Sequence, residues 1–159
     1  MQRFTAWVFL AGIIALIGVA IHIGAIFGGP SWYTFFGAPP AIVQSARAGT
    51  MLAPLCSAAI AAAMALCAAY AFSAVGYIRR VPLLRPGLAS IAAVCLLRAL
   101  VLVPLVVSHP ELRNTFEVLA ALVWGMAGVG FALGFAFTPV QPPNPFANGA
   151  GLRPVPHER

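Results

Sequence analysis

The stretch ASIAAVCLLRALVLVPLVV, from Ala89 to Val107, decides the fold class of this chain. A helix that crosses a bilayer needs about 20 predominantly apolar residues, and this run is long and apolar enough to do so. It also carries an arginine, Arg98, near its centre. Because a charge at that depth is costly, the rest of the chain must supply groups that make Arg98 tolerable.

The composition is that of a membrane protein. Of the 159 residues, 62% are hydrophobic and only 8% are charged, whereas about a quarter of the residues of a soluble chain are charged. All nine basic residues are arginines. They are scattered along the chain rather than gathered in a basic stripe with interleaved aromatics, so we expect no nucleic-acid partner. The abundance of alanine and the absence of lysine are typical of a GC-rich, bacterial coding sequence.

Four apolar runs predict four membrane spans, at about residues 4–27, 51–77, 88–107 and 116–137. We therefore expect an all-α membrane protein in which residues 1–137 form four transmembrane helices in a bundle. The first run continues well past Ala20, so it is too long to be the apolar core of a cleaved signal peptide. Residues 138–159 are rich in proline and lack hydrophobic periodicity, which predicts a disordered cytoplasmic tail.

The segment 28–49, GGPSWYTFFGAPPAIVQSARAG, connects the first two apolar runs. Its glycines and prolines interrupt it too often for a membrane span, and only the part from about Pro40 to Ala48 is expected to form a short helix. We predict an interfacial loop here, because amphipathic aromatic rings gather at the level of the lipid headgroups. The aromatic residues of this loop are Trp32, Tyr33, Phe35 and Phe36.

The arginines outside the spans predict the orientation, because cytoplasmic loops carry an excess of positive charge. If the N-terminus is cytoplasmic, only Arg47 and Arg113 face outward. The other six loop and tail arginines then face the cytoplasm, at positions 3, 79, 80, 85, 153 and 159. We therefore expect a multi-pass protein of the bacterial inner membrane with both termini in the cytoplasm.

A polar cluster is predicted in the outer half of the helix bundle. His22 interrupts a face of small residues on the first span, and Glu117 begins a similar face on the fourth. Small faces are where membrane helices approach each other, so both side chains should point inward. The long side chain of Arg98 can extend toward the outer interface and reach the same level. Together with Arg47, at the end of the aromatic loop, these residues form the candidate binding cluster.

No catalytic residue, metal site or cofactor is expected. The chain contains no aspartate, so it has no Ser-His-Asp triad. The three cysteines, Cys56, Cys67 and Cys95, fall inside apolar runs. Their odd number and their spacing indicate neither a disulfide framework nor a zinc site. We expect them to behave as small buried hydrophobic residues.

Several functions are compatible with these features. The leading interpretation is a small integral membrane protein without catalytic chemistry, either an accessory subunit or a binder of an apolar molecule. Its expected partners are membrane lipids and, through the small-residue faces, another membrane protein or a second copy of the chain. The alternatives are a small transporter or proton-coupled carrier and, less favoured, a lipid-acting enzyme with His22 as general base and Arg98 as an electrostatic clamp. A purely structural role for the polar cluster also stays open.

Overall fold

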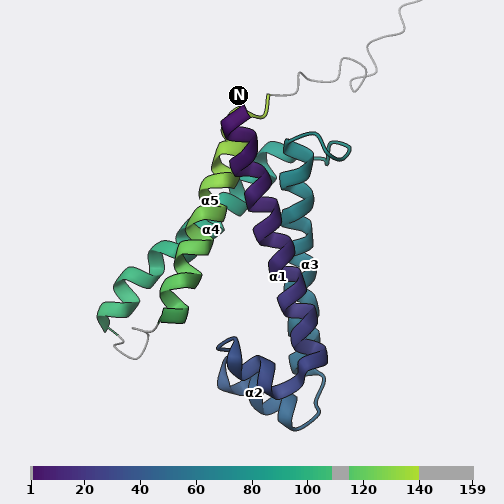
Figure 1. Ribbon diagram of the computed structural model, residues 1–159, viewed down its shortest axis with the longest axis vertical. Coiled ribbons are helices and arrows are strands. Elements are labelled where there is room, and N and C mark those ends of the chain that lie inside the picture. Colours follow the sequence, from purple (N-terminus) through teal and green to yellow (C-terminus); the bar gives the residue numbers. More distant parts are fainter. Residues whose placement is uncertain (1, 109–114, 140–159) are drawn as a thin grey trace, which may run out of the picture.

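The computed structural model describes residues 2–108 and 115–139, and these residues form helices and no strands (Figure 1). The helices are α1 (Gln2–Phe35), α2 (Pro40–Arg47), α3 (Leu52–Ala74), α4 (Leu84–Ser108) and α5 (Thr115–Phe137). All except the short α2 are long and apolar enough to cross a membrane. The predicted all-α fold with four spans is therefore confirmed, and the chain is a multi-pass membrane protein.

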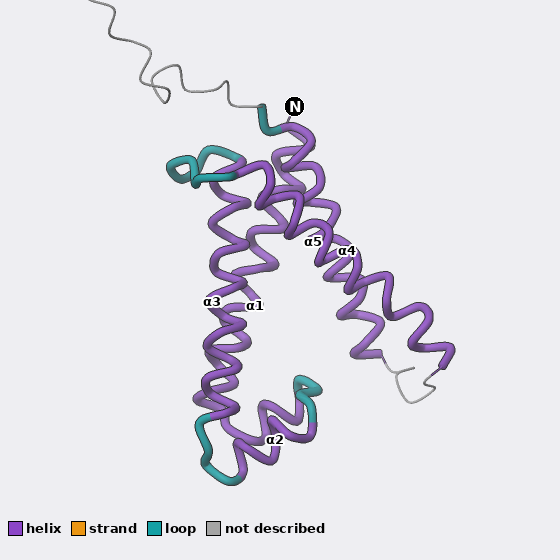
Figure 2. Tube along the Cα trace, turned by 180° about the vertical axis from the view of Figure 1, so that it is seen from behind, coloured by secondary structure: helices purple, strands orange, loops and turns teal. Residues whose placement is uncertain are grey.

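The four long helices are arranged as two hairpins. Helix α1 packs along α3, and α4 packs along α5. The hairpins meet where α1 and α5 lie against each other near the N-terminus, and they diverge toward the opposite end (Figures 1 and 2). The short helix α2 lies at that opposite end of the α1–α3 hairpin, on the side that faces the opening.

The junction of the hairpins depends on small residues. A Cβ atom on Gly130 of α5 would lie 2.6 Å from the carbonyl oxygen of Trp7 and 2.7 Å from the Cβ of Ala11, both on α1. Only glycine therefore allows the two helix backbones to approach this closely. The predicted small-residue face of α1 is indeed buried, at Ala11, Ala15, Gly18 and Ala25.

The core lies at the same junction, where all four long helices contribute side chains. Phe131 of α5 and Leu88 of α4 are fully buried there. Val8 of α1 and Ala71 of α3 belong to the same cluster. Large side chains from one hairpin thus pack against small or branched side chains of the other, which fixes how the two hairpins are joined.

Arg85 fastens the start of α4 to the end of α5. Its Nη1 donates a hydrogen bond to the carbonyl oxygen of Thr138 at 2.7 Å. Its guanidinium also lies over the ring of Phe135, 4.8 Å from the ring centre. A cation at this position suits the negative end of the α5 dipole. Thr138, the first residue of the predicted tail, is buried; residues 140–159 lie outside the described part of the chain, so the tail stays a prediction.

Helix α1 is longer than the predicted span 4–27. It breaks at Gly29, where φ is 67° and ψ is −156°, and helical structure resumes through Pro30 to Phe35. Glycine adopts such a positive φ at little cost, and proline is well suited to the first turn of a helix. A side chain on Gly28 would overlap the indole of Trp32, so the glycines also let this ring pack back on the helix. The sequence GGP therefore joins two helical segments, whereas the prediction was that it begins a loop.

The short helix predicted from about Pro40 to Ala48 is confirmed as α2. This helix also provides the cap of the next helix, α3. The hydroxyl oxygen of the buried Ser45 accepts a hydrogen bond from the backbone N–H of Ala53 at 3.0 Å. The Ser45 and Thr50 hydroxyls are 2.7 Å apart. The first N–H groups of a helix have no partner inside that helix. Ser45 therefore ties α2 to the beginning of α3.

Candidate functional site

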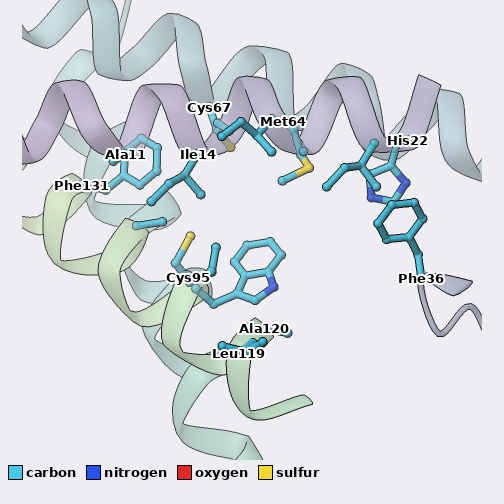
Figure 3. A pocket seen from close by; sticks show the side chains of 17 residues that line it. Ala11, Ile14, His22, Phe36, Met64, Cys67, Cys95, Leu119, Ala120 and Phe131 are labelled. Carbon is cyan, nitrogen blue, oxygen red and sulfur yellow. The ribbon is translucent and has the colours of Figure 1, made fainter. Parts of the chain in front are cut away.

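A cavity of about 530 Å³ lies between the two hairpins (Figure 3). Residues of α1, α3, α4 and α5 line it, together with Phe36 from the connection between α1 and α2. Its volume falls within the range of small-molecule binding sites, about 300–1,000 Å³. Such sites occur preferentially between helices of a membrane or soluble bundle, so this cavity is the candidate functional site.

Small residues on the walls create this space. Ala11, Ala15 and Gly18 present the small face of α1 to the cavity, and Ala120 and Ala127 do the same from α5. A Cβ atom on Gly18 would overlap the thioether of Met64, so the glycine lets the Met64 side chain lie across α1. Larger residues at these positions would fill the space between the hairpins.

The lining of the cavity is almost entirely apolar. Among the described residues that line it, only His22 and Trp124 carry side-chain nitrogen atoms, and only Met64, Cys67 and Cys95 carry sulfur. Figure 3 shows His22 and Phe36 at one end of the cavity and Ala11 at the other, with the sulfur-containing residues between them. The cavity therefore has an apolar body with a single titratable nitrogen base near one end.

A metal site is not formed by these side chains. In the ranges 2–108 and 115–139, no group of three or more His, Cys, Asp or Glu residues is placed so that it could hold a metal ion. Cys67 and Cys95 line the same cavity from different hairpins and are free thiols. They contribute soft, polarizable surface to it.

Arg98 and Glu117 form an ion pair beside the cavity. The Nη2 atom of Arg98 on α4 lies 3.6 Å from Oε2 of Glu117 on α5. Hydrogen-bonded ion pairs are shorter, at about 2.7–2.9 Å, so this pair is loosely made. The Arg98 side chain is 44% exposed and the Glu117 side chain 22%. Glu117 lies one helical turn before Ala120, a residue of the cavity wall.

The structure brings together two of the four residues of the predicted polar cluster. Arg98 and Glu117 meet, whereas His22 lines the cavity from α1 and Arg47 is exposed at the end of α2. In the described part of the chain, no hydrogen bond or ion pair joins His22 or Arg47 to the Arg98–Glu117 pair. A single cluster of all four residues stays a prediction.

The four aromatic residues predicted at the interface take different positions. Trp32 and Phe35 are exposed at the end of the α1–α3 hairpin, 44% and 77% respectively, and their place at the membrane interface stays a prediction. Tyr33 instead is buried, and its hydroxyl oxygen accepts a hydrogen bond from Ser57 of α3 at 3.1 Å. Phe36 lines the cavity. Two of the four rings thus face the interior of the protein.

Sequence reasoning missed the cavity and most of its lining. The small faces of the first and fourth spans were a partial signal, because they mark the helix faces that point toward other helices. Nothing in the sequence indicates that Cys67, Cys95 and Trp124 face the same space. That juxtaposition depends on the angle between two hairpins, which no local pattern specifies.

The sequence matches no known protein family, and neither a curated protein nor a solved structure is significantly similar to it. The function is therefore inferred from the geometry of the cavity and of the ion pair beside it.

Proposed function

We propose that this chain is a non-catalytic protein of the bacterial inner membrane that binds an apolar molecule in the cavity between its hairpins. The observation that carries the proposal is the cavity itself, with about 530 Å³ of space and a lining made almost entirely of carbon and sulfur. The cavity lies between hairpins that diverge away from their junction (Figure 2). A ligand dissolved in the bilayer would enter it from the side, between the hairpins. Membrane lipids or other bilayer-dissolved molecules are the proposed partners.

The excess of arginine on one side supports the orientation with a cytoplasmic N-terminus. The N-terminus and the connection between α3 and α4 lie at one end of the molecule, and α2 lies at the other (Figure 1). That connection contains the exposed Arg79 and Arg80. An excess of arginine at one end supports a cytoplasmic location for that end. The α1–α2 corner, with Phe36, then lies on the outer side of the membrane.

A small transporter or proton-coupled carrier is the second candidate. His22 supports it, because an ionisable residue inside a membrane protein is by default a functional candidate. The histidine also lines the cavity. This candidate predicts flux of a substrate across vesicles that contain the purified protein, which a binding protein would not show.

Trp124 provides a direct test of the binding function. It lines the cavity, whereas Trp7 and Trp32 are exposed on the outer surface. In the double variant Trp7→Phe, Trp32→Phe, the fluorescence of Trp124 reports on the cavity alone. We expect a dibrominated long-chain alcohol, added to the protein in lipid nanodiscs, to quench this fluorescence with saturation at a low mole fraction.

The matched control keeps Trp7 and carries Trp32→Phe and Trp124→Phe. Because Trp7 faces outward, its quenching should rise only in proportion to the brominated probe in the bilayer. Equal, unsaturated quenching of Trp124 and Trp7 would show that the cavity binds no such molecule. A second protein that co-purifies in constant ratio and blocks the quenching would instead identify a partner subunit as the occupant.

A further inference from the structure

His22 is the feature of the cavity that the proposed function leaves unused. It lines one end of the cavity, and in the described part of the chain its imidazole has no hydrogen-bond partner. A neutral imidazole offers one donor and one acceptor. A hydroxyl group also offers both, so the two groups complement each other in either direction.

The apolar lining alone contributes little binding free energy for a ligand that is already dissolved in the bilayer. Lipid tails are as apolar as the side chains of the cavity, so moving a hydrocarbon chain from one to the other gains little from the hydrophobic effect. A polar head in hydrocarbon, by contrast, lacks any hydrogen-bond partner and is poorly tolerated there. A hydrogen bond to His22 is thus the interaction that distinguishes the cavity from the surrounding lipid.

The length of the cavity is sufficient for a hydrocarbon chain. Its two ends, at Ala11 and His22, lie on one helix and are separated by about 16.5 Å along α1 at a rise of 1.5 Å per residue. The polar group stands near one end and apolar side chains surround the rest. This arrangement matches a molecule with one polar head and one hydrocarbon tail.

The charges around the cavity argue against an ionised head. No arginine, lysine, aspartate or glutamate is among the described residues that line it. Arg98, one helical turn after the lining residue Cys95, is already paired with Glu117. A carboxylate or phosphate head would therefore lose its hydration without gaining an opposite charge.

We infer that the ligand is a neutral single-chain amphiphile, a long-chain alcohol, whose hydroxyl group hydrogen-bonds to His22. This inference rests on the proposed binding function. Its tail extends from His22 toward Ala11, along the junction side of the cavity. The head then lies at the α1–α2 corner, next to Phe36.

Three matched probes test this inference on the chain that retains only Trp124. They are a dibrominated dodecanol, the corresponding dibrominated alkane without a head, and the corresponding dibrominated fatty acid in its ionised form. We expect the alcohol to reach half-maximal quenching at about a tenfold lower mole fraction than the alkane, the difference that one hydrogen bond can supply. The ionised acid should bind more weakly than the alcohol.

Substitutions at His22 provide the matched control. His22→Phe should raise the half-maximal mole fraction of the alcohol about tenfold and leave the alkane unchanged. His22→Gln keeps a donor and an acceptor and should restore much of the preference for the alcohol. Comparing the three probes on the unsubstituted His22 needs no variant at this site, so a poorly folded His22→Phe protein would not leave the inference untested.

The outcomes separate this inference from the proposed function. If no probe shows saturable quenching, the binding function itself is wrong. If all three probes saturate at the same mole fraction, or if the ionised acid binds best, the cavity binds apolar molecules but the neutral head and its bond to His22 are wrong. Preference for the alcohol that survives His22→Phe would likewise overturn the role of His22.

Discussion

The guanidinium of Arg98 and the carboxylate of Glu117 join α4 to α5 across a distance of 3.6 Å. The pair therefore lies within one hairpin and does not bridge the two hairpins. The pair explains how the charge of Arg98 is tolerated, because a charge in an apolar span needs an opposite charge or a route to water. It also leaves His22, on the other hairpin, available to the cavity.

The first prediction concerns the strength of this pair. Polar interactions between membrane helices contribute about 0.6 kcal/mol on average and at most about 1.7 kcal/mol. The long distance and the exposed Arg98 place this pair in the lower part of that range. A double-mutant cycle of Arg98→Leu and Glu117→Gln, measured by unfolding in detergent, should give a coupling free energy of about 0.5 kcal/mol. Strict additivity of the two single losses would show that the pair contributes nothing.

The second prediction concerns the junction of the hairpins. Gly130→Ala would place a methyl group 2.6 Å from a backbone oxygen of Trp7, so α1 and α5 must separate. Overpacking of this kind costs about 1–3 kcal/mol. Gly125→Ala, on the same helix, is the matched control, because its Cβ would lie 3.7 Å from Ala99 in ordinary contact. Equal thermal stability of the two variants would mean that the hairpins are not joined at Gly130.

The spans and the ion pair were accessible to sequence reasoning for physical reasons. Bilayer thickness sets the length of an apolar helix, so four apolar runs predict four spans without any knowledge of packing. Arg98 needed an acidic partner, and Glu117 was the acidic residue that began a small-residue helix face. Both constraints act on one residue or one segment at a time.

The interior positions of Tyr33 and Phe36 were not accessible in the same way. The glycines and the proline at 28–30 carry the local signal of a loop, and the aromatics that follow have the composition of a membrane interface. Whether helix resumes after Gly29 depends on tertiary contacts, such as the bond between Ser57 and Tyr33 and the packing of Trp32 on Gly28. A break at one glycine and the end of a helix look alike in sequence.

The third prediction concerns the cap that α2 gives to α3. Ser45→Ala removes the acceptor of the Ala53 N–H group in a buried place. A buried donor without a partner costs about 1–3 kcal/mol. Thr50→Val is the control, since it removes the hydroxyl that contacts Ser45 but leaves the bond from Ala53 to Ser45 intact. Thermal unfolding in detergent should show a clearly larger loss for Ser45→Ala, and a similar loss for both variants would contradict the cap.

The last prediction concerns orientation, which decides the side of the membrane on which the head of a ligand at His22 would lie. Phe35 and Tyr77 are suitable reporters, because they are 77% and 71% exposed and lie at the α1–α2 corner and in the α3–α4 connection. In a chain with Cys56, Cys67 and Cys95 replaced by alanine, either Phe35→Cys or Tyr77→Cys provides a single thiol. A maleimide that cannot cross the membrane, added to intact spheroplasts, should label the protein with Phe35→Cys and not the one with Tyr77→Cys, because the arginine excess predicts a cytoplasmic location for the α3–α4 connection. Both should react after the membrane is permeabilised, which controls for accessibility. Labelling of Tyr77→Cys alone in intact spheroplasts would reverse the orientation and move the His22 end of the cavity to the cytoplasmic side.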